Sequence, residues 1–189
     1  MQDLQALLDI SSRNHDHLCP RQILGVRMGL AGTAALGLEP QPSGKRLIVI
    51  LETDGCFADG IIAATGCTVG HRTLRVEDYG KVAGTFVDAT TGRSVRVIPH
   101  LDVRQRAAAC LPDIPSHYRA QMQAYQVLLE TELFVYTEVQ LKTPIQQIVS
   151  RPDVRVECAV CGEEILNERE IRRDGRNLCR TCAEGAYYR

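Results

Sequence analysis

The chain has no excess of either charge. Its 189 residues include 22 Lys and Arg against 23 Asp and Glu, which leaves a formal net charge of -1. Proteins that bind a nucleic-acid backbone depend on a surplus of basic side chains on one face. No such surplus exists here, so we do not expect nucleic acid as a partner.

Long apolar runs are also absent. Arg27 and several glycines interrupt the most apolar segment, residues 23–38, so we expect no membrane span. The first twenty residues contain Asp3 and Asp9 and lack both a basic region and an unbroken apolar stretch. We therefore expect no signal peptide and predict a cytoplasmic protein. Glycine-rich phosphate loops, HExxH and serine elbows are missing as well, which removes the commonest catalytic motifs.

Eight cysteines stand out against these absences. In a reducing compartment, cysteines indicate metal or redox chemistry more than disulfides. Four of them form two Cys-x-x-Cys pairs near the end of the chain, Cys158 with Cys161 and Cys179 with Cys182. This spacing predicts a structural Zn²⁺ site in which four thiolates close the coordination shell.

The segment between the two pairs supports a small zinc-binding fold. Gly162 permits the tight turn of the first pair, Asp174-Gly175 predicts a hairpin turn, and the second pair opens a short helix. Together these features predict a treble-clef or ribbon zinc finger that needs its ion to fold. Two redox-active pairs are the weaker alternative, because a thioredoxin-like motif requires a βαβ context.

The rest of the chain predicts an α+β core domain at residues 1–150, followed by the zinc finger at 151–189. Pro144 and Pro152 discourage helix before them and mark the boundary. Hydrophobic periodicity and turn residues predict helices at 3–11, 20–37, 57–66, 102–111 and 116–133, strands at 46–53 and 133–141, and a hairpin at 81–99 that turns at Thr91-Gly92. This order is too irregular for a Rossmann fold or a barrel.

Two of the remaining cysteines lie at predicted helix starts. Cys19 precedes Pro20, and Cys56 precedes the helix at 57–66. The exposed N–H groups and the dipole of a helix start favour a thiolate, which makes both residues candidate reactive thiols or metal ligands. Cys67 follows the second helix and is either a third ligand and reactive thiol or a packed side chain. Cys110, among alanines, is expected to be packed.

Histidines near Cys19 add candidate ligands. His15 and His17 alternate with Cys19, so an extended segment would send all three toward one side. Histidine and cysteine suit zinc or another transition metal, and a three-ligand set leaves a position open for chemistry. The alternative is that the histidines are solvated and the core cysteines are small apolar residues.

Several blocks resemble one family. HDHLCPRQILGVRMG, ETDGCFADGIIAATGCTVGHRTLRVEDYGK and the four-cysteine tail are similar, in this order, to the E subunits of formylmethanofuran dehydrogenase that carry an appended zinc finger. The resemblance implies a homodimeric α+β core with a treble-clef finger. It also implies a second transition-metal site in the core, for which zinc is the first choice. The residues of this core site are His17, Cys19, Cys56 and Cys67, with His15 and Asp59 nearby.

Two residues depart from the family pattern, and both bear on the ligand of the core site. Arg21 stands where glycine is common, and His71 stands where lysine is common. They leave the anion or substrate preference of the site open, and His71 is a further candidate ligand.

Two function classes remain open. The first is a redox or one-carbon role, in which the core metal or thiols act on a small-molecule substrate or support a molybdenum or tungsten oxidoreductase complex. The second is a non-enzymatic module, in which the zinc finger docks a partner protein or nucleic acid. Whether the chain turns over a substrate by itself stays open.

Overall fold

The computed structural model describes residues 3–13, 15, 17–148, 153–166 and 168–189. The chain divides into two compact units, Met1–Leu141 and Lys142–Arg189, called here the core unit and the tail unit. The boundary predicted between residues 150 and 151 lies outside the described residues.

The core unit contains one five-stranded sheet in the order β2-β1-β3-β4-β5. Only the β1–β2 pair is parallel, and the other neighbours are antiparallel. The strands are β1 (Leu47–Leu51), β2 (Leu74–Val76), β3 (Gly84–Asp88), β4 (Ser94–Pro99) and β5 (Phe134–Glu138). The β3–β4 hairpin turns through Gly92, whose φ of 76° suits glycine. The predicted α+β class is confirmed.

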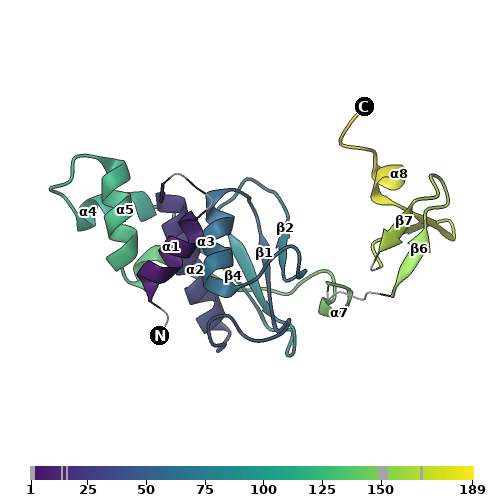
Figure 1. Cartoon of the computed structure of the whole chain (residues 1–189), viewed down its shortest axis with the longest axis horizontal. Coiled ribbons are helices and arrows are strands. Elements are labelled where there is room, and N and C mark those ends of the chain that lie inside the picture. Colours follow the sequence, from purple (N-terminus) through teal and green to yellow (C-terminus); the bar gives the residue numbers. More distant parts are fainter. Residues whose placement is uncertain (1–2, 14, 16, 149–152, 167) are drawn as a thin grey trace. The chain divides into compact units, whose positions relative to one another are not determined.

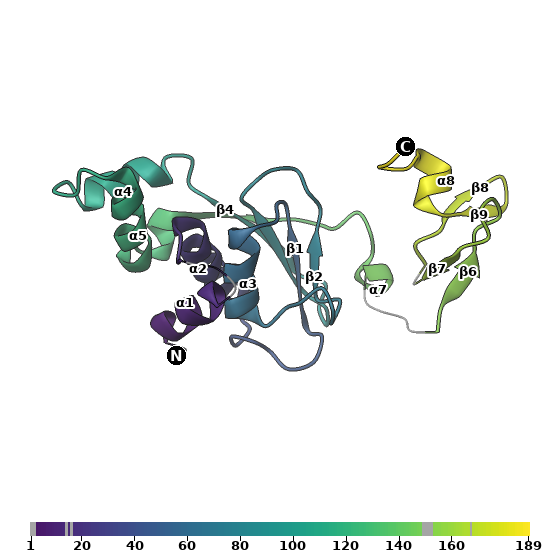
Figure 2. The same cartoon turned by 45° about the horizontal axis from the view of Figure 1, so that its top comes forward.

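Helices cover one face of this sheet, as Figures 1 and 2 show. The cross-strand row Leu74, Val49, Phe86 and Val95 belongs to the buried core cluster on that face. The helices are α1 (Leu4–Ser12), α2 (Pro20–Ala35), α3 (Cys56–Thr65), α4 (Val103–Cys110), α5 (His117–Val127) and α6 (Glu130–Leu133). Helix α2 lies directly on the sheet, because a Cβ on Gly32 would meet the Phe86 ring at 2.3 Å.

Helices α2 and α3 pack backbone to backbone. A Cβ on Gly25 would lie 2.3 Å from the Phe57 carbonyl oxygen, and one on Gly60 would lie 2.3 Å from that of Gln22. One turn later, a Cβ on Gly29 would meet Ala64. The contacts advance along both helices in the same direction, so the helices are parallel and both begin at the same end.

The predicted helix at 116–133 is interrupted. Ser116 caps it as expected, since its hydroxyl accepts a hydrogen bond from the Arg119 N–H, but α5 ends at Val127 and α6 begins at Glu130. Arg27 of α2 explains the break. Its guanidinium donates to the carbonyls of Tyr125, Gln126 and Leu128 at 2.7–2.9 Å, which satisfies the end of α5.

The tail unit contains two small hairpins and a terminal helix. Strands β6 (Arg155–Glu157) and β7 (Glu164–Leu166) flank the first cysteine pair, and β8 (Ile171–Arg173) and β9 (Arg176–Leu178) lead to the second. Helices α7 (Ile145–Ile148) and α8 (Arg180–Glu184) are short. The β8–β9 turn is at Asp174-Gly175 as predicted, with φ of 50° and 73°. The β6–β7 pairing was not predicted.

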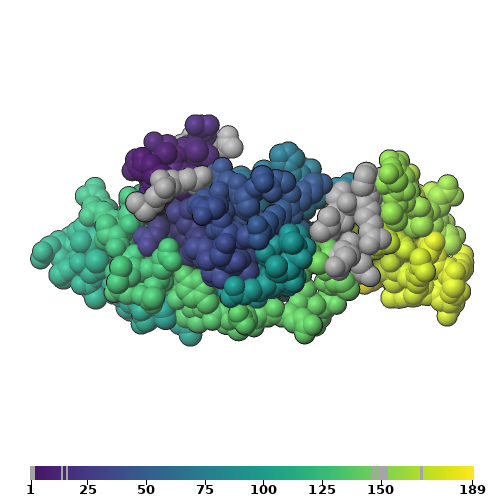
Figure 3. Space-filling view, turned by 90° about the horizontal axis from the view of Figure 1, so that it is seen from below, coloured from purple at the N-terminus to yellow at the C-terminus, as the bar shows by residue number. Residues whose placement is uncertain are grey.

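On one face of the core unit, segments distant in the sequence come to the surface together. Figure 3 shows the purple N-terminal residues, the blue residues after α2 and the green residues from α5 to β5 in this way. Among the described residues, no helix combines the length and apolar character needed to cross a membrane.

Candidate metal and thiol sites

The four tail cysteines converge on one point. Their sulfur atoms all lie within 4.8 Å of one another, and those of Cys161 and Cys179 are 3.8 Å apart. A tetrahedral Zn²⁺ with bonds of about 2.3 Å to sulfur spaces its ligands by about 3.8 Å. The donor set and its spacing therefore fit the predicted structural zinc.

The surroundings of these sulfur atoms also shift the pKa values of Cys158 and Cys182. Backbone N–H groups, first of Cys161 and then of Cys179 and Val160, lower the pKa of the Cys158 thiol to about 6. A hydrogen bond with the Cys179 thiol, and then burial, raise the pKa of Cys182 to about 12. A divalent ion held by all four thiolates would leave no coordination position for a substrate.

Cys19 and Cys56 are neighbours in the core. Cys19 is the N-cap of α2, and Cys56 is the first residue of α3. Because the two helices are parallel and in backbone contact, both thiols lie at the same end of the pair. Burial, and then hydrogen bonding and charge repulsion from Cys19, raise the pKa of Cys56. This shift is opposite in direction to the one expected from a helix start.

A buried glutamine that the sequence analysis missed fixes Cys19. The Gln22 side chain is fully buried, and its Oε1 accepts a hydrogen bond from the Cys19 N–H at 2.8 Å. Its Nε2 donates to the Ser11 carbonyl at the end of α1. Gln22 thus joins α1 to the start of α2. Its position three residues after the N-cap is the sequence signal that could have revealed it.

The predicted histidines lie close to this thiol pair in the sequence but differ in environment. His15 is half-buried, and its Nε2 lies 2.7 Å from Oδ2 of Asp59, one turn after Cys56 on α3. His17 is exposed. Within the described part of the chain, no group of three candidate ligand atoms other than the tail cysteines is as closely spaced.

The structure does not bring Cys67 to this pair. Cys67 follows the ten-residue helix α3 at its opposite end, about 15 Å along the axis from Cys56. It is 3% exposed, and its thiol donates to the Leu47 carbonyl at 3.5 Å. Burial raises its pKa. The alternative of a packed side chain describes Cys67, whereas Cys110, expected to be packed, is exposed.

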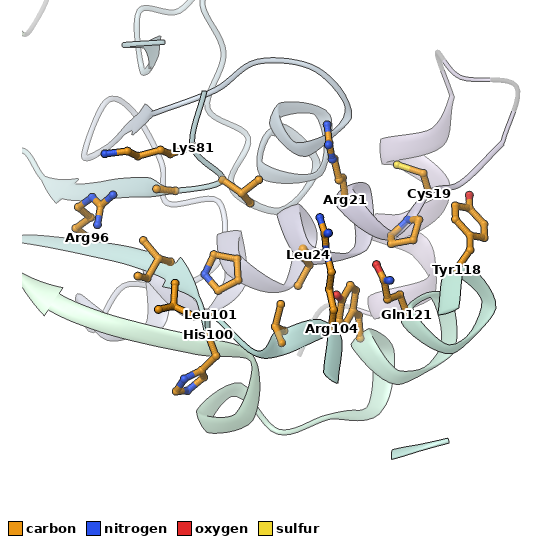
Figure 4. A pocket seen from close by; sticks show the side chains of 17 residues that line it. Cys19, Arg21, Leu24, Lys81, Arg96, His100, Leu101, Arg104, Tyr118 and Gln121 are labelled. Atoms are coloured by element: carbon orange, nitrogen blue, oxygen red, sulfur yellow. The ribbon is translucent and has the colours of Figure 1, made fainter. Parts of the chain in front are cut away.

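A cleft adjoins Cys19. Its volume is about 630 Å³, and its walls come from α2, β4, α4 and α5. Figure 4 shows Cys19 and Tyr118 at one side and Lys81 and Arg96 at the other. Arg21, one of the departures from the family pattern, also lines it. His71, the other departure, is exposed in the turn before β2.

Fold and sites together define an α+β protein with a thiol pair beside a cleft and an appended four-cysteine zinc finger. Residues 14–155 match the family described as FmdE, molybdenum formylmethanofuran dehydrogenase operon, and the chain belongs to that family. Residues 152–188 match the prokaryotic dksA/traR C4-type zinc finger. Both parts of the predicted resemblance are confirmed, and the tail makes this a metal-binding protein.

Two individual proteins place this family membership in context. A tungsten formylmethanofuran dehydrogenase FmdE-like protein from Syntrophus aciditrophicus shares the fold, with a TM-score of 0.59 and 21% identity over 100% of this chain and 96% of that one. A probable S-adenosyl-L-methionine-binding protein of Archaeoglobus fulgidus is 38% identical over 97 residues. The match covers 50% of this chain and 26% of that relative, so the chain spans about a quarter of the length of this curated relative.

Proposed function

We propose that the core unit binds a transition metal through Cys19 and Cys56 and serves a redox or one-carbon reaction, as an accessory protein or a component of a molybdenum or tungsten oxidoreductase. The observation that carries the proposal is the pairing of two thiols from separate helices beside an open cleft. Thiolates are strong ligands for zinc and related ions, and a bound ion replaces the protons that an empty pair retains.

The His15–Asp59 contact supports a metal at this place. A histidine that binds a metal commonly gives its second ring nitrogen to a carboxylate, which fixes its orientation. Here Asp59 holds Nε2 of His15 and leaves Nδ1 available. With His17 as a further candidate, the thiol pair could gain the third ligand of an open, catalytic type of site.

Metal content tests this proposal directly. We expect two metal ions per chain in the purified protein by inductively coupled plasma mass spectrometry, falling to one in Cys19→Ser and in Cys56→Ser. Cys110→Ser is the matched control, because Cys110 is exposed and belongs to neither site. A wild-type protein with one ion per chain, unchanged by Cys19→Ser, would contradict the core metal.

That contradicting result would favour a second function, a non-enzymatic module that docks a partner through the zinc finger. Exposed apolar side chains on the tail unit favour this alternative: Tyr187 is 99% exposed, and Val160 and Tyr188 are each 63% exposed. Substituting Tyr187 and Tyr188 by serine would then abolish partner binding while leaving the zinc in place.

We also propose that the core unit forms a homodimer in the cytoplasm. The family resemblance supports the dimer, and the exposed Val127 and Leu129 offer apolar surface for a second copy to cover. Light scattering coupled to size-exclusion chromatography should give twice the chain mass. The chain mass alone would refute the dimer.

A further inference from the structure

The cleft beside Cys19 has the dimensions of a small-molecule site. Its volume of about 630 Å³ falls within the usual range for such sites, and it lies entirely within the core unit. Leu24, Val103 and Ile98 contribute apolar wall. An apolar body therefore fits between the walls, and the polar groups decide which chemistry the cleft accepts.

Several basic side chains of the cleft already have protein partners. Arg96 donates to both oxygens of Glu52 at 2.5 and 2.7 Å, and Lys81 acts on the same carboxylate from a longer range. Nε2 of His100 lies 3.1 Å from the Thr131 carbonyl oxygen, and Arg106 donates to Nδ1 of His100 at 3.5 Å. These groups hold the cleft together.

Arg21 and Arg104 are different. Both are exposed, both line the cleft, and neither forms an ion pair with any residue that the structure describes. No Asp or Glu is among the residues that line it. In Figure 4 the two arginines extend from different elements into the middle of the cleft, between Cys19 and the Lys81–Arg96 side. Among the residues that the structure describes, these two guanidinium groups of the cleft have no counter-ion.

A largely buried tyrosine adds a neutral polar group to the cleft beside these charges. Tyr125 lines the cleft although it is only 1% exposed, and none of the described residues hydrogen-bonds its hydroxyl. The hydroxyl is not among the fully enclosed polar atoms that lack a partner, so it reaches the open space of the cleft, where a ligand or water can bond it. Burial raises the pKa of Tyr125, which keeps the hydroxyl protonated and able to donate, and Arg104 lies near enough to act on it.

We propose that this cleft binds an organic anion, with its carboxylate or phosphate on Arg21 and Arg104 and its apolar body against Leu24 and Val103. Guanidinium groups suit both acidic groups, because their paired N–H donors match two oxygens at once. The proposal deepens the function proposed above by naming the substrate class of the core site. It rests on that function only in placing the anion beside Cys19.

Isothermal titration calorimetry on the full chain at low salt tests the proposal. The probes are naphthoate, naphthyl phosphate and the neutral naphthalenemethanol. We expect saturable binding of at least one anion and much weaker binding of the alcohol. Arg21→Gln and Arg104→Gln should each weaken the anion by about tenfold, because each removes a charge-assisted hydrogen-bond pair. The preferred anion identifies the acidic group.

Arg119→Gln is the matched control. Arg119 is exposed on α5 and does not line the cleft, so its loss changes the net charge equally and should alter affinity less than about twofold. Circular dichroism verifies that each variant is folded. The proposal would be overturned if neither anion binds saturably or if the alcohol binds as tightly as the anions. Unchanged anion affinity in both Arg21→Gln and Arg104→Gln would also overturn it. Metal content in Cys19→Ser is measured separately, so the metal site and the anion site can fail independently.

Discussion

Replacing Gly25 by alanine should destabilise the core, although the same change stabilises most helices. The added Cβ would lie 2.3 Å from the Phe57 carbonyl oxygen and 3.0 Å from Cα of Gly60, where a carbon and an oxygen normally stay about 3.3 Å apart. These atoms belong to the backbone and cannot rotate away. Helices α2 and α3 must therefore separate by about 1 Å.

The expected loss follows from two opposing effects. Overpacking of a close contact costs about 3 kcal/mol at the upper end of the usual range. Alanine regains about 1 kcal/mol of helix propensity over glycine. The net loss is about 2 kcal/mol, which corresponds to a decrease in melting temperature of about 4–8 °C for a chain of this size.

Thermal unfolding followed by circular dichroism measures this decrease, with Gly70→Ala as the control. A Cβ on Gly70 would meet no atom within 4 Å, so its effect should stay within about 0.5 kcal/mol. Because the contact also sets the separation of Cys19 and Cys56, oxidation with diamide should form their disulfide more slowly in the Gly25 variant. A Gly25→Ala protein that melts at or above the wild-type temperature would refute the helix contact.

Three further changes test other parts of the molecule. Cys158→Ser removes one of the four zinc ligands, and we expect it to release the zinc and unfold the tail unit. Zinc binding contributes about 10–16 kcal/mol to the folding of comparable peptides, whereas the circular dichroism signal of the core unit should persist. Retention of the zinc would count against the site. Glu52→Gln tests the Arg96 ion pair. The hydrogen bond from Arg96 lowers the pKa of Glu52 in the folded protein, so the pair stabilises fully above the unfolded value of about 4.3 and is lost as the pH falls through the folded pKa. Urea unfolding should show a loss of about 1 kcal/mol at neutral pH that disappears in acid, and a difference independent of pH would contradict this reasoning. Arg27→Met removes three hydrogen bonds to the end of α5 and should cost about 2–3 kcal/mol, with faster hydrogen exchange near Leu128; unchanged exchange there would show that Arg27 does not hold the helix end.

Local signals in the sequence were sufficient for most elements. Pro20 at a first helical position and Ser116 at a cap predicted where helices begin, and Gly92 and Asp174-Gly175 predicted two hairpin turns. The tail site was predictable for the same reason, since the spacing within each cysteine pair fixes the local geometry of its ligands. These features depend on neighbouring residues alone.

Features that depend on distant contacts were not predictable. Strand β2 has three residues and exists because it pairs with β1, and the break after α5 depends on an arginine about a hundred positions earlier. Likewise, the sequence could not show that Cys67 lies at the far end of α3, nor that parallel packing of α2 on α3 brings Cys19 and Cys56 together.

The hydrogen bonds from Arg27 to the end of α5 have a consequence for ligand entry. Helix α2 carries Arg21 and Leu24 of the cleft, and α5 carries Gln121 and Tyr125. Because one side chain joins these two helices, the walls that they contribute move as a single body. A ligand then binds to a pre-formed site. Stopped-flow binding traces should therefore contain one concentration-dependent phase and no slow closing step.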